Sequence, residues 1–339
     1  MLTRTLSLVG LLALLSAPPR AQQVIVTDLA DVLPAEALAA LQSPKDVQTV
    51  FPVSAEERFE GQYLFADQLV FSEGGHLVLE SVDAPFVLIA TRSLKFEDPN
   101  AYSRISFARP EPTTPPQATD GSDGPNASGR SGRHGRPGAN GRPGTTGRTG
   151  ASHALPDLYI YTQSVEAPQG VPPFVSLAVL GAGIDGGDGG QGGNGGDGGD
   201  GYSGLVAAPG FPDCKRGGGD GGPGGDAGQG GQGGAGGTGG DGLTLQIIAP
   251  RAVADVLSYT RVLNVGGFGG RGGTPGRAGR PGDGGERGRG RGNCGGGSSG
   301  RDGRTPSPAD LGRGLDGADG VKGTFELVVP ANSVAYLDL

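Results

Sequence analysis

The sequence has few of the residues that build an ordinary hydrophobic core. Aromatic residues make up 5% of its 339 positions, and tryptophan is absent. Glycine and proline are abundant instead, with 71 and 27 residues, which is well over twice their usual share of roughly 12%. Such a composition without a period is typical of disorder. We therefore expect a hydrophobic core only outside the glycine-rich parts, and only a regular repeat could order the rest.

Long apolar runs are also missing, because no stretch reaches the roughly 20 apolar residues that cross a bilayer. The short run Leu6–Leu15 follows Arg4 and precedes small residues, which is the pattern of a secretory signal peptide. We predict a signal peptide over residues 1–21 with cleavage after Ala21, and cleavage after Ala17 is the alternative. The sequence thus predicts a protein that is secreted or at the cell surface, in an extracellular or periplasmic setting, without a membrane span.

Cysteine and histidine are scarce, which limits metal and catalytic chemistry. Cys214 and Cys294 belong to no C-x-x-C motif, so a metal site is not expected. Export to an oxidising compartment favours a disulfide between them, and free or intermolecular thiols are the alternative. His76, His134 and His153 lie far apart, and the chain contains neither a G-x-S-x-G elbow nor an H-E-x-x-H motif. We therefore predict no catalytic, cofactor or metal site and do not expect an enzyme.

The parts that are not glycine-rich predict short strands. Residues 22–60 indicate an N-terminal segment with a short helix, with Pro34 in its first turn. In residues 61–119, apolar clusters recur about every 7 to 11 residues, as in a sandwich, barrel or solenoid. The continuous run Ala84–Ala90 fits a strand buried on both faces. Further strands are predicted in three segments, residues 155–181, 243–267 and the C-terminal 324–339.

Glycine recurs at every third position in tracts across residues 120–323. The longest tracts run from Gly129 to Gly150, Gly183 to Gly204, Gly218 to Gly242 and Gly267 to Gly288, with shorter echoes at 297–303 and 314–323. A period of three matches the polyproline-II helix. In the second and third tracts two positions of each triplet are nearly all glycine, and the third is mostly Asp, Asn or Gln. Two bare ridges would let such rods pack closely on two sides, with the polar ridge solvated.

These tracts predict an intramolecular polyglycine-II bundle interleaved with the strands. At about 3.1 Å per residue each rod would extend roughly 70 Å, and its backbone groups would have to pair with neighbouring rods. The first and fourth tracts are rich in arginine, whereas the second and third are acidic, which favours packing basic rods beside acidic ones. The predicted fold class is all-β, with short strands in a sandwich or solenoid, an interleaved bundle and little α-helix.

The G-G-X tracts joined by short strands resemble the polyglycine-II bundles of phage tail-fibre tip adhesins and of arthropod glycine-rich antifreeze proteins. The G-X-Y tracts also resemble bacterial collagen-like secreted proteins. In the phage adhesins, specificity resides in loops between the rods. The resemblance implies that residues 201–218 and 292–314 are the matching loops.

We therefore expect a secreted structural or adhesive protein whose bundle is a rigid scaffold that displays loops to an extracellular surface or matrix ligand. We expect a monomer that does not bind nucleic acid. A collagen-like trimeric stalk is one alternative. An ice-binding protein is another, although the exposed ridges carry charged and amide residues with few threonines. A polysaccharide-acting enzyme is the last, but Asp83 and Glu97 are isolated carboxylates that show no catalytic pair.

Overall fold

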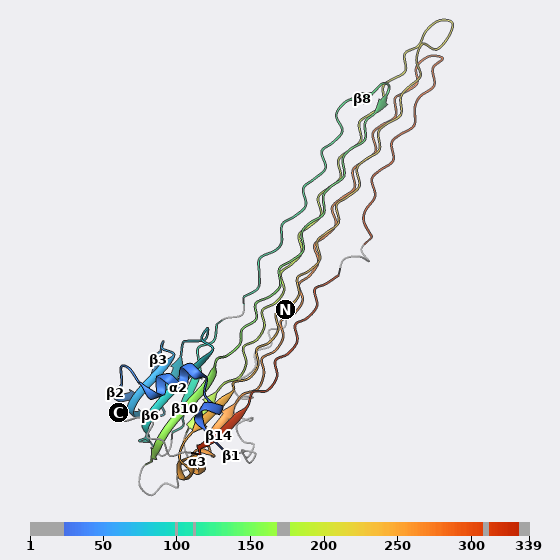
Figure 1. Cartoon of the computed structure of the whole chain (residues 1–339). Helices are drawn as coiled ribbons and strands as arrows, with labels where there is room; N and C mark the ends of the chain where they lie inside the picture. Colours follow the sequence, from blue (N-terminus) through green and yellow to red (C-terminus); the bar gives the residue numbers. More distant parts are fainter. Residues whose placement is uncertain (1–23, 99–100, 111–112, 168–176, 308–311, 332–339) are drawn as a thin grey trace.

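The computed structural model describes residues 24–98, 101–110, 113–167, 177–307 and 312–331. A base of β-sheets carries a long bundle of extended segments (Figure 1). The predicted signal peptide with its cleavage position lies outside the described residues, as do residues 332–339 of the predicted C-terminal strands.

The base consists of two sheets in which every pairing is parallel. The seven-stranded sheet has the order β1-β14-β12-β10-β6-β4-β2 and the five-stranded sheet the order β13-β11-β7-β5-β3. The strands of the first sheet are β1 (Val24–Thr27), β2 (Gln48–Val53), β4 (Tyr63–Phe71), β6 (Phe86–Phe96), β10 (Asp157–Glu166), β12 (Leu245–Ile248) and β14 (Phe325–Pro330). Those of the second are β3 (Glu56–Phe59), β5 (His76–Leu79), β7 (Ser103–Phe107), β11 (Leu177–Leu180) and β13 (Arg261–Leu263).

From β2 to β14 the successive strands of these two sheets alternate between them. Parallel strands cannot be joined by a tight hairpin. Each turn of the chain therefore adds one strand to each of the two sheets, as in a solenoid. The prediction of a strand-rich chain with little helix is confirmed. The sandwich that the spacing also allowed is wrong, because sandwiches are built from antiparallel strands. The solenoid also begins earlier in the chain than expected, since β2 and β3 lie within residues 22–60.

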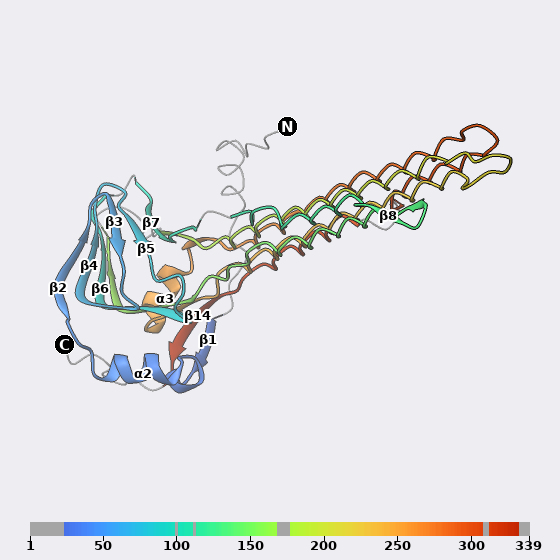
Figure 2. The same cartoon turned by 90° about the horizontal axis from the view of Figure 1, so that it is seen from above.

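Two hydrophobic layers hold the seven-stranded sheet. Along β6, Val87 and Ile89 belong to the cluster between the two sheets. Phe86, Leu88 and Ala90 belong to a second cluster on the other face. That face is covered by the N-terminal segment, which contains the single-turn helix η1 (Leu29–Asp31) and the helix α2 (Ala35–Gln42) (Figure 2). The prediction of a strand buried on both faces is therefore confirmed for this run.

Three long hairpins leave the base at the same place in consecutive turns. Each starts after a strand of the five-stranded sheet (β7, β11 or β13) and returns to a strand of the seven-stranded sheet (β10, β12 or β14). We call the six extended segments arms 1 to 6, comprising residues 113–127, 135–153, 183–207, 218–242, 265–288 and, for arm 6, 297–307 together with 312–323. The helix α3 (Arg251–Leu257) lies between β12 and β13, where the sequence predicted only strands.

Backbone hydrogen bonds join the arms at intervals of three residues. In arm 4, the N–H of Gly231 donates to the carbonyl of Gly193 in arm 3 at 2.7 Å, and its carbonyl accepts from Gly276 in arm 5 at 2.9 Å. Two residues on, the N–H of Gly233 donates to arm 6. Between them, the carbonyl of Gln232 accepts from Gly147 in arm 2 at 2.9 Å. One triplet thus bonds to four neighbours, and the odd and even arms form two layers.

The arms differ in number from the four predicted tracts. Arm 1 was not predicted as a rod, because only Gly121 and Gly124 mark its period. The two short echoes at 297–303 and 314–323 are parts of arm 6. The bonds from arm 4 to arm 6 shift by two residues there, from Ala227 with Arg304 to Gly233 with Gly312. Of the second predicted loop, residues 297–307 and 312–314 therefore belong to an arm.

Close approach of the arms requires glycine at the inward positions. A Cβ at Gly231 would overlap the backbone carbonyl of Thr145. We expect Gly231→Ala to lower the free energy of unfolding by about 1–3 kcal/mol, because a close-packed backbone must move. Gly295→Ala is the matched control, since a Cβ there meets nothing within 4 Å. Denaturant unfolding measures both variants, and equal stability would show that the arms are not packed as described.

Candidate functional site

The three hairpin turns lie at the end of the bundle far from the base (Figure 1). We define the distal tip as residues 128–134, 208–217 and 289–296. The first turn contains the two-residue strands β8 (Arg130–Ser131) and β9 (His134–Gly135), which pair antiparallel. The other two turns are closed by single antiparallel bridges, Ala208 with Arg216 and Arg291 with Cys294.

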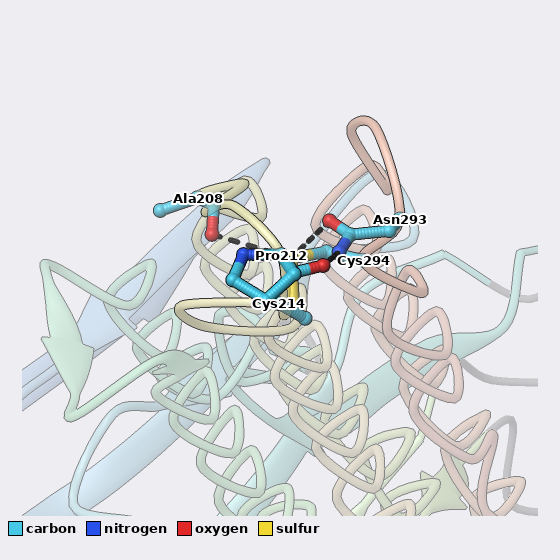
Figure 3. Close-up of a disulfide and its surroundings, with 5 residues drawn as sticks. All are labelled: Ala208, Pro212, Cys214, Asn293 and Cys294. Carbon is cyan, nitrogen blue, oxygen red and sulfur yellow. Dashed lines mark hydrogen bonds between the residues drawn. A yellow bond between two sulfur atoms is a disulfide. The ribbon is translucent and has the colours of Figure 1, made fainter.

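A disulfide joins the second and third turns (Figure 3). Cys214 and Cys294 are bonded with a Cα–Cα distance of 5.0 Å, so the predicted disulfide is confirmed. Beside it, the side-chain amide of Asn293 donates to the carbonyl of Pro212 at 3.0 Å. Two loops about 80 residues apart in the chain are thereby held as one surface.

The distal tip is strongly basic. It contains six basic residues and one acidic residue, Asp213, whereas the whole chain has a net charge of −8. The basic residues are Arg130, Arg133, Lys215, Arg216, Arg289 and Arg291. All six are exposed. Phe211 stands among them with a fully exposed side chain, at 101% of its reference area.

We call the six arms together the shaft. Side chains of the first turn fix this turn to the shaft. The guanidinium of Arg130 lies 5.0 Å from the centre of the Tyr202 ring, and its Nε donates to the carbonyl of Ser203. His134 Nδ1 accepts the backbone N–H of Asp220 at 3.1 Å. The pKa of the Asp220 carboxyl is lowered mainly because it accepts the N–H of Ser298. Its stabilising effect is therefore present above the ordinary carboxyl pKa and is lost as the pH falls through the lowered value.

Along the shaft, the polar position of many triplets has a structural role when it is occupied by Asp or Asn. Asp197 donates its own N–H to the Asp123 carboxylate at 2.8 Å, and its carboxylate accepts the N–H of Arg280 at 2.7 Å. These N–H groups point outward and take no part in the backbone–backbone hydrogen bonds between arms. The same relay recurs in four other sets, Asp120–Asn194–Arg277, Asn126–Asp200–Asp283, His134–Asp220–Ser298 and Asn140–Asp226–Arg304.

These relays change how the acidic ridges are understood. The sequence indicated solvated acids, but many of these carboxylates accept backbone N–H groups of the neighbouring arm in the same layer. Asn194 and Asn140 do the same, so the oxygen matters and the charge does not. Basic and acidic arms do lie side by side, yet among the described residues no salt bridge of an arginine or lysine joins two arms. The signal in the sequence for this acceptor role was the use of the short residues Asp and Asn, in place of Glu, at the polar positions.

The remaining histidines and carboxylates that the sequence singled out lie at three separate places in the described part of the chain. His76 Nε2 lies 2.8 Å from Ser106 Oγ in the base, and its pKa is lowered mainly by burial. His153 and Asp83 line a cavity of about 360 Å³ where the arms meet the base. Glu97 pairs with Lys95 at 3.0 Å.

A second cavity, of about 650 Å³, lies between α2 and the seven-stranded sheet and is lined by Lys45, Asp46 and Tyr63, among others. Burial raises the pKa of the Tyr63 hydroxyl, with a smaller effect of the Glu36 charge. Within the described part of the chain, no three histidine, cysteine or carboxylate side chains gather as a metal site. None of the described helices has the length and apolar character needed to cross a membrane.

Comparisons with known proteins give little. No family model matches the chain, and no curated protein matches it. Among solved structures, a match is a springtail antifreeze protein from Granisotoma rainieri, described as a bundle of nine polyproline type II helices. The two share 24% identity over 56% of this chain and 98% of that chain, with a TM-score of 0.08. A TM-score this low carries no argument about fold or function.

The relay of side-chain acceptors predicts a difference between two substitutions at Asp197. Asp197→Ala removes the acceptor of the Arg280 N–H and should cost about 0.5–1 kcal/mol of stability. Asp197→Asn keeps an acceptor oxygen and should be nearly neutral. Amide hydrogen exchange at Arg280 checks this directly: it should speed up in the alanine variant and stay as in the parent in the asparagine variant. Equal exchange in both would contradict the assigned role.

The disulfide predicts a local effect at the tip. In the double variant Cys214→Ser/Cys294→Ser, we expect faster proteolysis and faster amide exchange in residues 208–217 and 289–296. The amides of arms 3 and 4 near the base should keep their protection, because their bonds do not depend on the tip. Mass spectrometry of limited digests and of exchanged peptides measures both regions. Loss of protection along the whole shaft would show instead that the disulfide holds the bundle together.

Proposed function

We propose that this chain is a secreted binding scaffold, in which a polyglycine-II bundle holds two disulfide-linked loops far from a β-solenoid base. The observation that carries the proposal is the cross-bonding of three hairpins that start from neighbouring turns of one solenoid. Such a network resists bending, because an inner triplet such as residues 231–233 bonds to four other arms. A rigid spacer with exposed loops at one end is suited to contact with a surface.

Several features support the polyglycine-II assignment. The bonds between arms recur every third residue, which is the period of that helix. The inward positions are glycines at which a Cβ would overlap a neighbouring backbone, as at a crowded helix axis. An arm of about 25 residues would then extend roughly 75 Å.

The hydrogen bonding also favours a monomer over a collagen-like trimer. The inward N–H groups of arms 2 to 5 already donate within one chain, and a triple helix would need the same groups for other chains. For ice binding, the exposed ridges offer charged and amide groups where a flat threonine face would be expected.

The disulfide supports export. A bridge between exposed loops persists in an oxidising compartment, and the N-terminal pattern predicts a signal peptide. The partner we propose is accordingly an extracellular surface or matrix component that meets the tip.

The test of the scaffold is its shape and mass in solution. Residues 22–339 should sediment as a monomer, and small-angle X-ray scattering should show a rigid shaft of about 75 Å that projects from a wider base. The variant Cys214→Ser/Cys294→Ser is the control for a shaft that does not rely on the tip. An elongated trimer would replace this proposal with a collagen-like stalk. A monomer with the dimensions of an unfolded chain would remove the scaffold altogether.

A further inference from the structure

We propose that the distal tip binds an acidic polysaccharide, through the basic side chains of its two cross-linked turns and the ring of Phe211. This inference rests on the proposed function, because it names the ligand class of the loops that the scaffold displays. It starts from a charge distribution that the shaft does not share.

Four basic residues are brought together by the contacts at the tip. The backbone bridge between Ala208 and Arg216 and the disulfide from Cys214 fix one turn. The carbonyl of Arg289 accepts the N–H of Ala207 at 2.9 Å, and Arg291 bridges to Cys294. Lys215 and Arg216 therefore lie on one turn, and Arg289 and Arg291 lie on the turn joined to it.

These four side chains are available to a ligand. All are exposed, and no ion pair in the described part of the chain involves any of them. The single acidic residue of the tip is Asp213. Uncompensated positive charge on a chain with net charge −8 steers a polyanion toward the tip and away from the acidic arms 3 and 4.

Phe211 adds a contact that charge alone does not explain. The fully exposed phenylalanine offers a large apolar surface that a ligand can bury with a gain in free energy. The apolar face of a sugar ring stacks on such a ring. A lipid bilayer would require more, because surface binding to membranes scales with buried apolar area, and the tip offers this one large apolar side chain.

The tip is also prearranged for binding. The disulfide and the bond from Asn293 to Pro212 hold both turns before any ligand arrives. Ordering of loops on binding costs affinity, and a cross-link reduces that cost. Several fixed cations on adjoining turns suit a linear polymer with a repeated negative charge, to which each cation contributes a little.

The experiment measures binding of the full chain to heparin and to polygalacturonate, with neutral dextran as the uncharged polymer. The tip variant Lys215→Gln/Arg216→Gln/Arg289→Gln/Arg291→Gln is compared with a shaft variant that removes the same charge, Arg142→Gln/Arg148→Gln/Arg277→Gln/Arg280→Gln. We expect the tip variant to bind at least about tenfold more weakly and the shaft variant to change less than about threefold, with affinity that falls as salt rises.

The aromatic contact has its own matched pair. Phe211→Ala should weaken binding about threefold to tenfold, whereas Phe268→Ala, on the exposed ridge of arm 5, should leave it unchanged. Circular dichroism and thermal unfolding confirm that each variant is folded. Equal losses in the tip and shaft variants would overturn the proposal, because binding would then follow net charge alone.

Two further probes test whether the tip binds another class of partner. Vesicles of phosphatidylglycerol and a DNA duplex are tested at the same salt concentration. Binding to vesicles or DNA with no binding to either acidic polysaccharide overturns the ligand class. The shape measurement above is independent of all these probes, so a tip without polysaccharide affinity would leave the scaffold intact, and a chain without the shaft would remove both.

Discussion

The structure depends on one repeated contact, the backbone hydrogen bond that an arm makes to its neighbour at every third residue. This bond requires two extended backbones to approach until no side chain fits between them, and glycine is the residue that allows it. Ordering so much glycine has a large entropic cost, and a single pair of arms could not offset it. Six arms bond to one another in two layers, so each inner arm is fixed on several sides. The abundance of glycine, which alone would indicate disorder, is therefore the condition for order here.

The base decides where the arms begin. Because β7, β11 and β13 are neighbours in one sheet, and β10, β12 and β14 are neighbours in the other, the three hairpins leave and return side by side. The bonds continue from sheet to arm without a gap, as when Gly181 donates to Leu263 and Gly183 donates to Val265. At the far end, the disulfide ties two of the hairpins together. The base thus sets the register that the glycine positions alone would leave free to slide by three residues, and the disulfide holds the two tip loops together.

Charge serves two separate purposes along the molecule. On the shaft, Asp and Asn oxygens accept the N–H groups that point outward, and most arginines extend into solvent. At the tip, cationic side chains on two tied loops lack such partners among the described residues. Many carboxylates of the shaft are occupied, whereas the four cations of the two tied turns form no ion pair among the described residues. This difference would direct an anionic ligand to those loops, which is how the proposed scaffold and its proposed ligand fit together.

The sequence by itself determined the local features: the period of three, the alternation of glycine tracts with strands, the strand Phe86–Ala90 buried on both faces, and the pair Cys214 and Cys294. These follow from residues a few positions apart or from a choice of two cysteines. Only the tertiary structure decided the solenoid, the helix α3, the assignment of residues 113–127 as an arm, and the role of the Asp ridges. In arms 3 and 4 the acceptors and donors of those ridges are 74 or more residues apart, as for Asp123 with Asp197 and for Asp197 with Arg280. A three-residue period reveals that a rod can pack, but it is the same in every rod, so the choice of neighbour comes from the base that aligns them.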